Sequence, residues 1–364
     1  MNNRGVALIL SYMVIATLTI LSSAFLWSSS SESIAARNYS NSTHAFWVAE
    51  AGMAQAYQNW VNGVTQPTGG VSFGEGSYSI DTSSLPIASV TGTCGSNVRT
   101  IQASFVRIPS AFDNTVSVGR NMTLNGLLCR VEAHDKTRIT GVFSKPWGGT
   151  AVFDDKLEGV NQSLTTIPIP DLNQNGTSNE FGDFVALGQQ AAGGYPANEV
   201  VYIPTDSDVT IFPDTALVGK KIIFVQGSAP GKGNVNIVFG GTWQDNQDLT
   251  VISTGKITYL QPLGIGANSR LSTVSWGNYV EGAVFRSQHE SLIYSHADAN
   301  FVDFLSWSEI TGNIIANRDL TLLEVLTFQK FVYSNRAQSG DMPPGFEFLN
   351  VPNGTPKFTD WQEI

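Results

Sequence analysis

Charged side chains are scarce in this chain. Only 14% of its 364 residues are Asp, Glu, Lys or Arg, and the formal net charge is −10. Phosphate binding needs clustered Lys and Arg, and no such cluster occurs. The composition therefore argues against a nucleic-acid partner. The chain is rich in Gly, Ser, Thr and Asn, which favours a β-rich extracellular domain.

Metal-binding side chains are also few. The four histidines show no metal-ligand spacing, and the only two cysteines, Cys94 and Cys129, are too far apart for a zinc site. In an oxidising compartment the cysteines could form a disulfide, which would close a loop of about 35 residues and contribute ~3 kcal/mol. The sequence leaves this disulfide and two free thiols equally open.

The N-terminal region lacks both charge and proline. Residues 6–31 carry no charged side chain, and no proline precedes Pro67. At ~1.5 Å per residue, a run of about 26 residues can cross a ~30 Å hydrocarbon core, which predicts a transmembrane helix over 6–31. The alternative is a cleaved secretory signal, whose apolar core is usually ~7–15 residues long. With Arg4 as the only nearby positive side chain, the positive-inside rule predicts a cytoplasmic N-terminus and an exported remainder.

The helix is expected to continue beyond the membrane. Asn62 and Gly63 provide a C-cap, so we expect one helix over 6–63. Alternating segments separated by turn residues then predict a small antiparallel sheet over 71–112, packed on the helix. The helical side of this contact is a stripe of apolar residues at helical spacing, consisting of Tyr39, Phe46, Ala49, Met53, Ala56, Tyr57 and Trp60.

Two segments of this helix resemble those of a known family. A short leader ends in Gly5 and runs directly into the apolar residues 6–10, and residues 46–53 read Phe-Trp-Val-Ala-Glu-Ala-Gly-Met. This arrangement resembles the minor pilins of type IV pili, especially the PilX type, and more distantly the pseudopilins of type II secretion. The resemblance implies that residues 1–5 are removed by a prepilin peptidase after Gly5 and that Val6 becomes a methylated N-terminus. It also implies a single-pass inner-membrane precursor that joins other pilin subunits and the pilus assembly machinery, and then reaches a pilus or the cell surface.

The chain departs from the family at its fifth mature residue. Major pilins carry a glutamate there, whereas this chain has Leu10. In the family, that carboxylate is thought to pair with a neighbouring subunit's amino terminus inside the apolar fibre, where an unpaired charge is costly. Leu10 therefore favours a minor or tip subunit, while small residues such as Ala7, Ser11 and Ala16 would allow close helix contacts. The alternative is an ordinary signal-anchored exoprotein.

The remainder of the chain predicts a β-rich head over 113–336. Strand-like segments at 251–259, 284–294 and 314–322 recur at intervals of about thirty residues, which is typical of the stacked coils of a β-solenoid. We therefore expect an α+β protein with a long N-terminal helix and a solenoid-like head, followed by an irregular tail over 337–364. A β-sandwich is the alternative fold. No catalytic pattern is present and no enzyme activity is expected, although a membrane-anchored carbohydrate-active protein is the alternative class because solenoids host such enzymes.

One segment of the head resembles the first half of a calcium-binding loop. Oxygen-bearing side chains alternate from residue 171 and are followed by Gly176, but the twelfth position is Gly182, where an EF-hand has a bidentate glutamate. A structural calcium ion is one interpretation, and an asparagine-rich surface turn is the other. The candidate ligands are Asp171, Asn173, Asn175, Thr177, Glu180 and Asp183.

Overall fold

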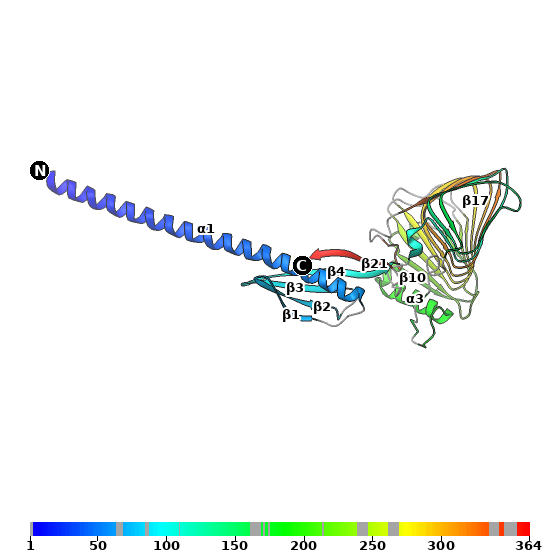
Figure 1. Cartoon of the computed structure of the whole chain (residues 1–364), viewed down its shortest axis with the longest axis horizontal. Helices are drawn as coiled ribbons and strands as arrows, with labels where there is room; N and C mark the ends of the chain where they lie inside the picture. The colour runs from blue at the N-terminus through cyan, green and yellow to red at the C-terminus, as the bar shows by residue number, and fades with distance from the viewer. Residues whose placement is uncertain are drawn as a thin grey trace. The chain divides into compact units, whose positions relative to one another are not determined.

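The computed structural model describes residues 3–62, 68–83, 87–108, 110–160, 169, 172–173, 175–212, 215–238, 247–260, 269–334, 342–345 and 355–364. The chain divides into two compact units. Unit 1 comprises Met1–Phe105 and Phe358–Ile364, and unit 2 comprises Val106–Lys357 (Figure 1). Unit 2 is thus inserted into the sequence of unit 1. The expected α+β class, with one long N-terminal helix and a head of stacked strands, is confirmed.

Unit 1 is built on the helix α1, Asn3–Val61, which is 59 residues long. No proline interrupts it, and the Asn62 amide still donates to the Gln58 carbonyl oxygen at 3.1 Å. Its C-terminal part packs on a sheet whose order is β1-β2-β3-β4-β21. The strands are β1 (Thr68–Phe73), β2 (Gly76–Asp81), β3 (Ile87–Cys94), β4 (Asn97–Ile108) and β21 (Thr355–Glu363).

Helix and sheet approach each other closely because small residues lie between them. A Cβ added at Gly92 of β3 would lie 2.3 Å from the Ala45 carbonyl oxygen, and one at Gly52 of α1 would lie 2.7 Å from Val90 Cγ1. Tyr39, which the sequence places in the apolar stripe, is exposed, so the buried stripe begins only at Ala45. The helix residues of this core are Ala45, Val48, Ala49, Met53, Ala56 and Trp60.

The C-terminal tail differs from the expectation. Residues 337–364 were predicted to be irregular, but Thr355–Glu363 forms β21 beside β4. The Ile364 amide donates to the Thr100 carbonyl oxygen at 3.0 Å, and Arg99 Nη1 lies 2.9 Å from Glu363 Oε1. The apolar residues Phe358 and Trp361 do not alternate with a period of two, so the pairing of this segment with the free backbone edge of β4 left no local sequence signal.

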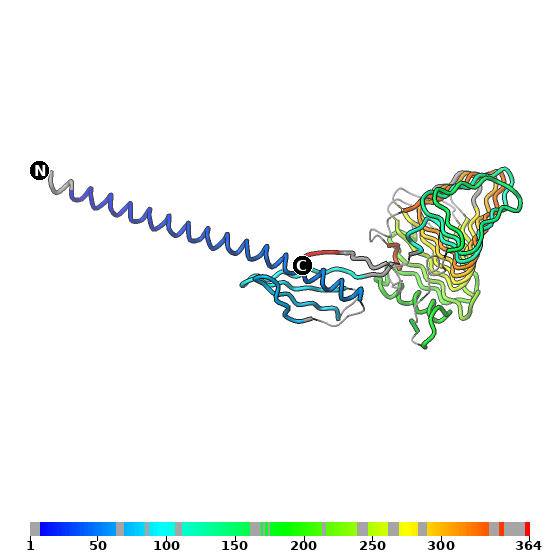
Figure 2. The backbone as a smooth tube through the Cα atoms, viewed as in Figure 1, coloured from blue at the N-terminus to red at the C-terminus, as the bar shows by residue number. Residues whose placement is uncertain are grey.

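Unit 2 is a parallel β-solenoid, as predicted; its stacked turns are visible in Figure 2. Within the described residues of this unit, the helix α3 (Phe181–Gly193) and three 3-10 turns accompany the coils: η1 (Ser110–Asp113), η2 (Ala197–Glu199) and η3 (Thr215–Leu217). The strands are β5 (Val116–Val118), β6 (Met122–Leu127), β7 (Arg130–Ile139), β8 (Phe143–Ser144), β9 (Thr150–Glu158), β10 (Val200–Pro204), β11 (Val209–Ile211), β12 (Ile222–Gln226), β13 (Val235–Val238), β14 (Asp248–Ser253), β15 (Ile257–Leu260), β16 (Arg270–Ser275), β17 (Tyr279–Ser295), β18 (Ala299–Ala316), β19 (Leu320–Val325) and β20 (Phe328–Tyr333).

The strands form three walls around one core. Wall 1 contains β10, β12, β14 and β16, then the ends of β17 and β18, and β5. Wall 2 contains β11, β13 and β15, then the starts of β17 and β18, and β19, β6 and β8. Wall 3 contains the middle parts of β17 and β18, with β20 and the first residues of β7 and β9.

The coils do not follow the order of the chain. β19 pairs with β6 in unbroken register from Leu320↔Met122 to Val325↔Leu127, although the two strands are far apart in sequence. At the corner that precedes wall 2, stacked Asn and Asp side chains form a ladder from coil to coil. The side-chain oxygen of each accepts a hydrogen bond from a backbone amide of the next coil. Asp319 Oδ1 accepts from the Asn121 amide at 3.0 Å, and Asn121 Oδ1 accepts from the Val142 amide at 3.2 Å. The ladder of side chains therefore continues from the coil of β19 to that of β6, although these two coils are not consecutive in the sequence.

Candidate functional site

The first candidate site is the N-terminal part of α1. α1 contains the only span in the described part of the chain that is long and apolar enough to cross a membrane, and a signal sequence would meet the same criterion. None of its most apolar stretch is buried. Leu10, Ser11 and Ala16 are exposed on it, while the side chains of Val6 and Ala7 and the exposure of Gly5 are not described. The predicted processing site and helix contacts therefore stay predictions, and the described residues of the chain leave the apolar surface of this part of α1 uncovered.

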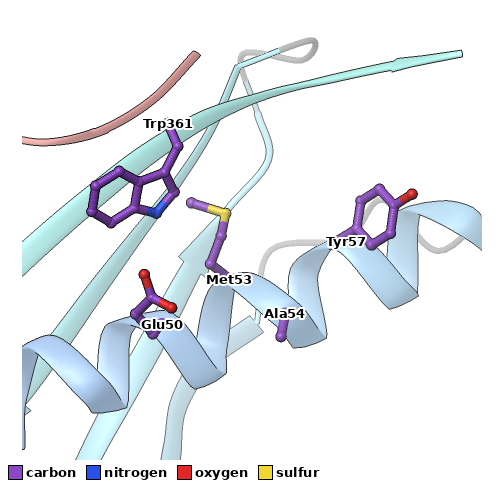
Figure 3. Close-up of a pocket in the computed structure, with 5 residues that line it drawn as sticks. All are labelled: Glu50, Met53, Ala54, Tyr57 and Trp361. Atoms are coloured by element: carbon purple, nitrogen blue, oxygen red, sulfur yellow. The ribbon is translucent and has the colours of Figure 1, made fainter. Parts of the chain in front are cut away.

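The C-terminal part of α1 contributes to a groove within unit 1. A cavity of about 460 Å³ is lined by Glu50, Met53, Ala54 and Tyr57 of α1 and by Trp361 of β21 (Figure 3). The Trp361 ring also lies edge-on to Phe46, with 6.0 Å between the ring centroids. The sequence could not identify this groove, because residues 53 and 361 come together only once β21 has joined the sheet.

The second candidate site is the outer surface of wall 2, which we call the flat face. Strands of this wall alternate buried and more exposed residues, so every second side chain points outward. None of the outward side chains among the described residues is charged. They are Thr210, Asn236, Val238, Thr258, Leu260, Val280, Gly282, Asn300, Val302, Phe304, Thr321, Leu323, Val325, Thr123, Asn125, Leu127 and Ser144.

The strand register aligns these residues in rows across the coils. One row is mainly hydroxyl and amide and contains Thr258, Val280, Asn300, Thr321 and Thr123 in successive register. The hydroxyl oxygen of Thr258 is itself buried. Because neighbouring strands lie about 4.8 Å apart, the row repeats at that interval. A second row is mainly aliphatic. The outer surface of wall 3 differs, since it carries ion pairs such as Lys330 with Glu309 at 3.2 Å.

The interior corner between walls 2 and 3 holds three fully buried acids, Glu281, Asp303 and Glu324. Thr327 Oγ1 donates to Glu324 Oε2 at 2.6 Å, and Ser308 Oγ donates to Asp303 Oδ2 at 3.0 Å. Burial, reinforced by the Asp303 charge, raises the pKa of Glu324 to about 8. Burial also raises the pKa of Glu281 well above its ordinary value. Since solvent does not reach these groups, they influence stability and not surface chemistry.

The predicted calcium loop forms the N-terminal cap of α3. Asp183 is buried; its Oδ1 accepts from the amides of Leu172 and Asn173 at 2.9 and 3.1 Å, and its Oδ2 accepts from the Glu180 amide at 3.1 Å. Asn175 Nδ2 donates to Glu180 Oε2 at 3.0 Å. Asp171 lies outside the described residues, and within the described residues, this loop included, no cluster of three or more His, Cys, Asp or Glu could hold a metal. The capping box was the signal that sequence reasoning missed. Calcium binding stays a prediction.

Cys94 and Cys129 are both free and buried, so the disulfide that the sequence left open is not formed in this structure. Cys94 ends β3 in unit 1, where its Sγ lies 4.0 Å from the Glu75 carbonyl oxygen. Cys129 belongs to the solenoid core of unit 2. Each thiol therefore packs as a small apolar side chain within its own unit.

Comparisons with known proteins identify no family. No protein-family profile matches the chain, and no curated protein matches it. Three solved structures share weak similarity at low identity. An ice-binding protein from an Antarctic biological consortium is 12% identical and has a TM-score of 0.29, over 63% of this chain and 90% of that one.

The other two solved structures show a similarly weak similarity to this chain. The DUF3494 domain of Shewanella frigidimarina ice-binding protein 1 is 12% identical with a TM-score of 0.30, over 62% of this chain and 98% of its own. The competence-associated pilin ComZ from Thermus thermophilus is 10% identical and has a TM-score of 0.32, over 89% of this chain and 98% of that one. At such TM-scores we draw no functional conclusion from these three structures.

Proposed function

We propose that the protein is a minor pilin or pilin-like subunit, anchored in the inner membrane by the N-terminal part of α1 before assembly, with its solenoid displayed outside the cell. The observation that carries this proposal is the division of α1. From Leu8 to Tyr39 its large apolar side chains are more than half exposed, whereas from Ala45 to Trp60 one stripe is buried against the sheet. An uncovered apolar helix needs lipid or neighbouring helices around it. After assembly, other subunits' helices would replace the lipid.

Processing by a prepilin peptidase tests this proposal directly. When the full chain is co-expressed with the peptidase, mass spectrometry should find a mature protein that begins at methylated Val6. A Gly5→Val variant should retain Met1. An intact N-terminus in the unmodified chain, or cleavage near Ala24, would exclude the pilin assignment and favour an anchored exoprotein or a secreted protein.

The flat face favours a second candidate function for the head, which is adhesion to ice. An ice surface is a flat, periodic array of water. A face of hydroxyl, amide and methyl groups at a fixed repeat could order a matching water layer, whereas charged groups would hold hydration shells of their own. The support is the uncharged outward set of wall 2 and its unbroken register.

Ice adhesion predicts thermal hysteresis and inhibited ice recrystallisation by the purified full chain. Thr321→Lys, which places a charge in the middle of the flat face, should abolish both effects. Thr150→Lys adds the same charge to an exposed position at the start of β9, on wall 3, and should leave both unchanged. The absence of any ice activity in the unmodified protein would reject this candidate without affecting the pilin proposal.

A further inference from the structure

A separate cavity lies in unit 2, at the C-terminal end of α3. Its volume is about 460 Å³, within the range of small-ligand sites. Its walls include Gln189 and Gly193 of α3, Tyr195 beyond the helix, and Tyr202 and Phe224 from the neighbouring strands β10 and β12. Neither the flat face nor the N-terminal helix contributes to it.

The cavity is built around an aromatic platform. Tyr202 and Phe224 are register partners on β10 and β12, and their rings lie 5.6 Å apart between centroids at an interplanar angle of 31°. Phe224 is fully buried, whereas Tyr202 is 49% exposed. The buried ring therefore supports the Tyr202 ring from the neighbouring coil, and Tyr202 retains substantial surface open to solvent. Tyr195 adds a second tyrosine to the lining.

Polar groups are fixed beside this platform. Gln226 Oε1 accepts hydrogen bonds from the Tyr202 hydroxyl at 2.9 Å and from Gln189 Nε2 at 3.3 Å. This arrangement orients the Tyr202 hydroxyl and the two amides, which together offer donors and acceptors to a ligand. No charged side chain lines the cavity among the described residues. The site is thus aromatic, amide-rich and uncharged.

We propose that this cavity binds a neutral oligosaccharide. A sugar ring has an apolar C–H face, which packs on an aromatic ring, and hydroxyl groups at its edge, which exchange hydrogen bonds with amides and tyrosine hydroxyls. A charged sugar would be desolvated in the cavity without a counterion. A purely apolar ligand would cover the remaining donor and acceptor groups of the Gln189 and Gln226 amides without hydrogen-bonding them. The proposal goes beyond the assembly role and does not depend on peptidase processing.

The chain offers a variant that closes the cavity without disturbing the core. A Cβ added at Gly193 has no atom within 4 Å, and Gly193 has no positive φ. Gly193→Phe should therefore fold normally and fill the cavity. Tyr202→Ala removes the platform, while Tyr202→Phe keeps the ring and removes only the hydroxyl. Trp147→Ala removes another exposed aromatic ring, 66% exposed and outside the cavity, and serves as the matched control.

The test uses the full chain in detergent on an array of neutral and sulfated glycans, followed by calorimetry with the best neutral binder. We expect a neutral glycan to bind, Tyr202→Ala to weaken it about tenfold, and Gly193→Phe to abolish it. Tyr202→Phe should show a smaller loss, and Trp147→Ala should show none. A preference for sulfated glycans, no neutral binder, or binding unchanged in both cavity variants would overturn the proposal. An apolar dye that enters the cavity and is not displaced by sugars would also overturn it.

Discussion

The two units differ in the composition of their buried cores. Unit 1 buries an apolar helix stripe on an antiparallel sheet, and its core is almost wholly hydrocarbon and aromatic. Unit 2 stacks parallel coils and buries many polar groups, including Glu281, Asp303 and Glu324. The difference indicates that unit 1 depends on shape, through close contact at small residues, whereas the solenoid depends in addition on the protonation of its interior.

The largest expected effect is a difference between the two units in how their stability depends on pH. In the folded state, burial raises the pKa of Glu324 from its ordinary value of about 4.5 to about 8, so between these values the folded form holds a proton that the unfolded form has lost. Stability from this group is fully present below about pH 4.5 and is lost as pH rises to about 8, at ~1.4 kcal/mol per pH unit. Burial lowers the pKa of His296 in unit 2 to about 4, so this group adds stability as pH rises towards its ordinary value of about 6.5 and opposes the Glu324 effect below that pH. Thermal unfolding of unit 2 should therefore shift downward between pH 6.5 and pH 8, while that of unit 1 should change little.

Glu324→Gln sharpens this test. The amide cannot ionise, so the variant should unfold with a flatter pH dependence, and the remaining slope would come from Glu281, whose pKa is also raised by burial. Glu309→Gln replaces a glutamate on the outer side of wall 3 and should preserve the slope. Calorimetry measures the pH dependence of the unfolding temperature in the unmodified protein and in both variants. An equal pH dependence in all three would contradict the role assigned to the buried acids.

A second prediction addresses shape in unit 1. Gly92→Val places a branched side chain against the Ala45 carbonyl oxygen and the Ala49 backbone amide, which lie 2.3 and 2.5 Å from the added Cβ. Overpacking of this kind costs ~1–3 kcal/mol, so the unfolding transition of unit 1 should fall, with no change in its pH dependence. The control is Gly69→Val, because no atom lies within 4 Å of a Cβ at that position. Equal transitions in the two variants would refute the close approach of helix and sheet.

These contrasts also explain what the sequence could and could not predict. The helix follows from an uninterrupted local pattern, and the solenoid follows from repeated strand-like segments. The joining of β19 to β6, and of β21 to β4, involves residues far apart in the chain, and parallel or edge pairing leaves no local periodicity that specifies the partner. The flat face depends on the register of β19 with β6, and the Tyr202 platform depends on the register of β10 with β12, so neither could be found from sequence alone.

The third prediction tests whether β21 belongs to unit 1 in solution. Trp361 packs beside Met53 and edge-on to Phe46 but remains 42% exposed (Figure 3). Trp361→Ala should destabilise unit 1 by ~1–2 kcal/mol, less than a fully buried aromatic ring would. Hydrogen exchange should then increase in β4, whose edge β21 covers. Unchanged exchange in β4 would indicate that the strand is not paired there.

The smallest effect concerns the ion pair at the same edge. Arg99 Nη1 and Glu363 Oε1 are 2.9 Å apart, but both side chains are more than a third exposed. Water and salt screen such a pair, so Glu363→Gln should cost no more than ~0.2–1 kcal/mol, and added salt should remove the difference. Arg99 also donates to Ser42 Oγ through Nε and Nη2 at 2.9 and 2.7 Å. Arg99→Ala should therefore cost more than Glu363→Gln. Equal losses in denaturant melts would mean that the link from β4 to α1 contributes nothing, and that unit 1 is held by its apolar core alone.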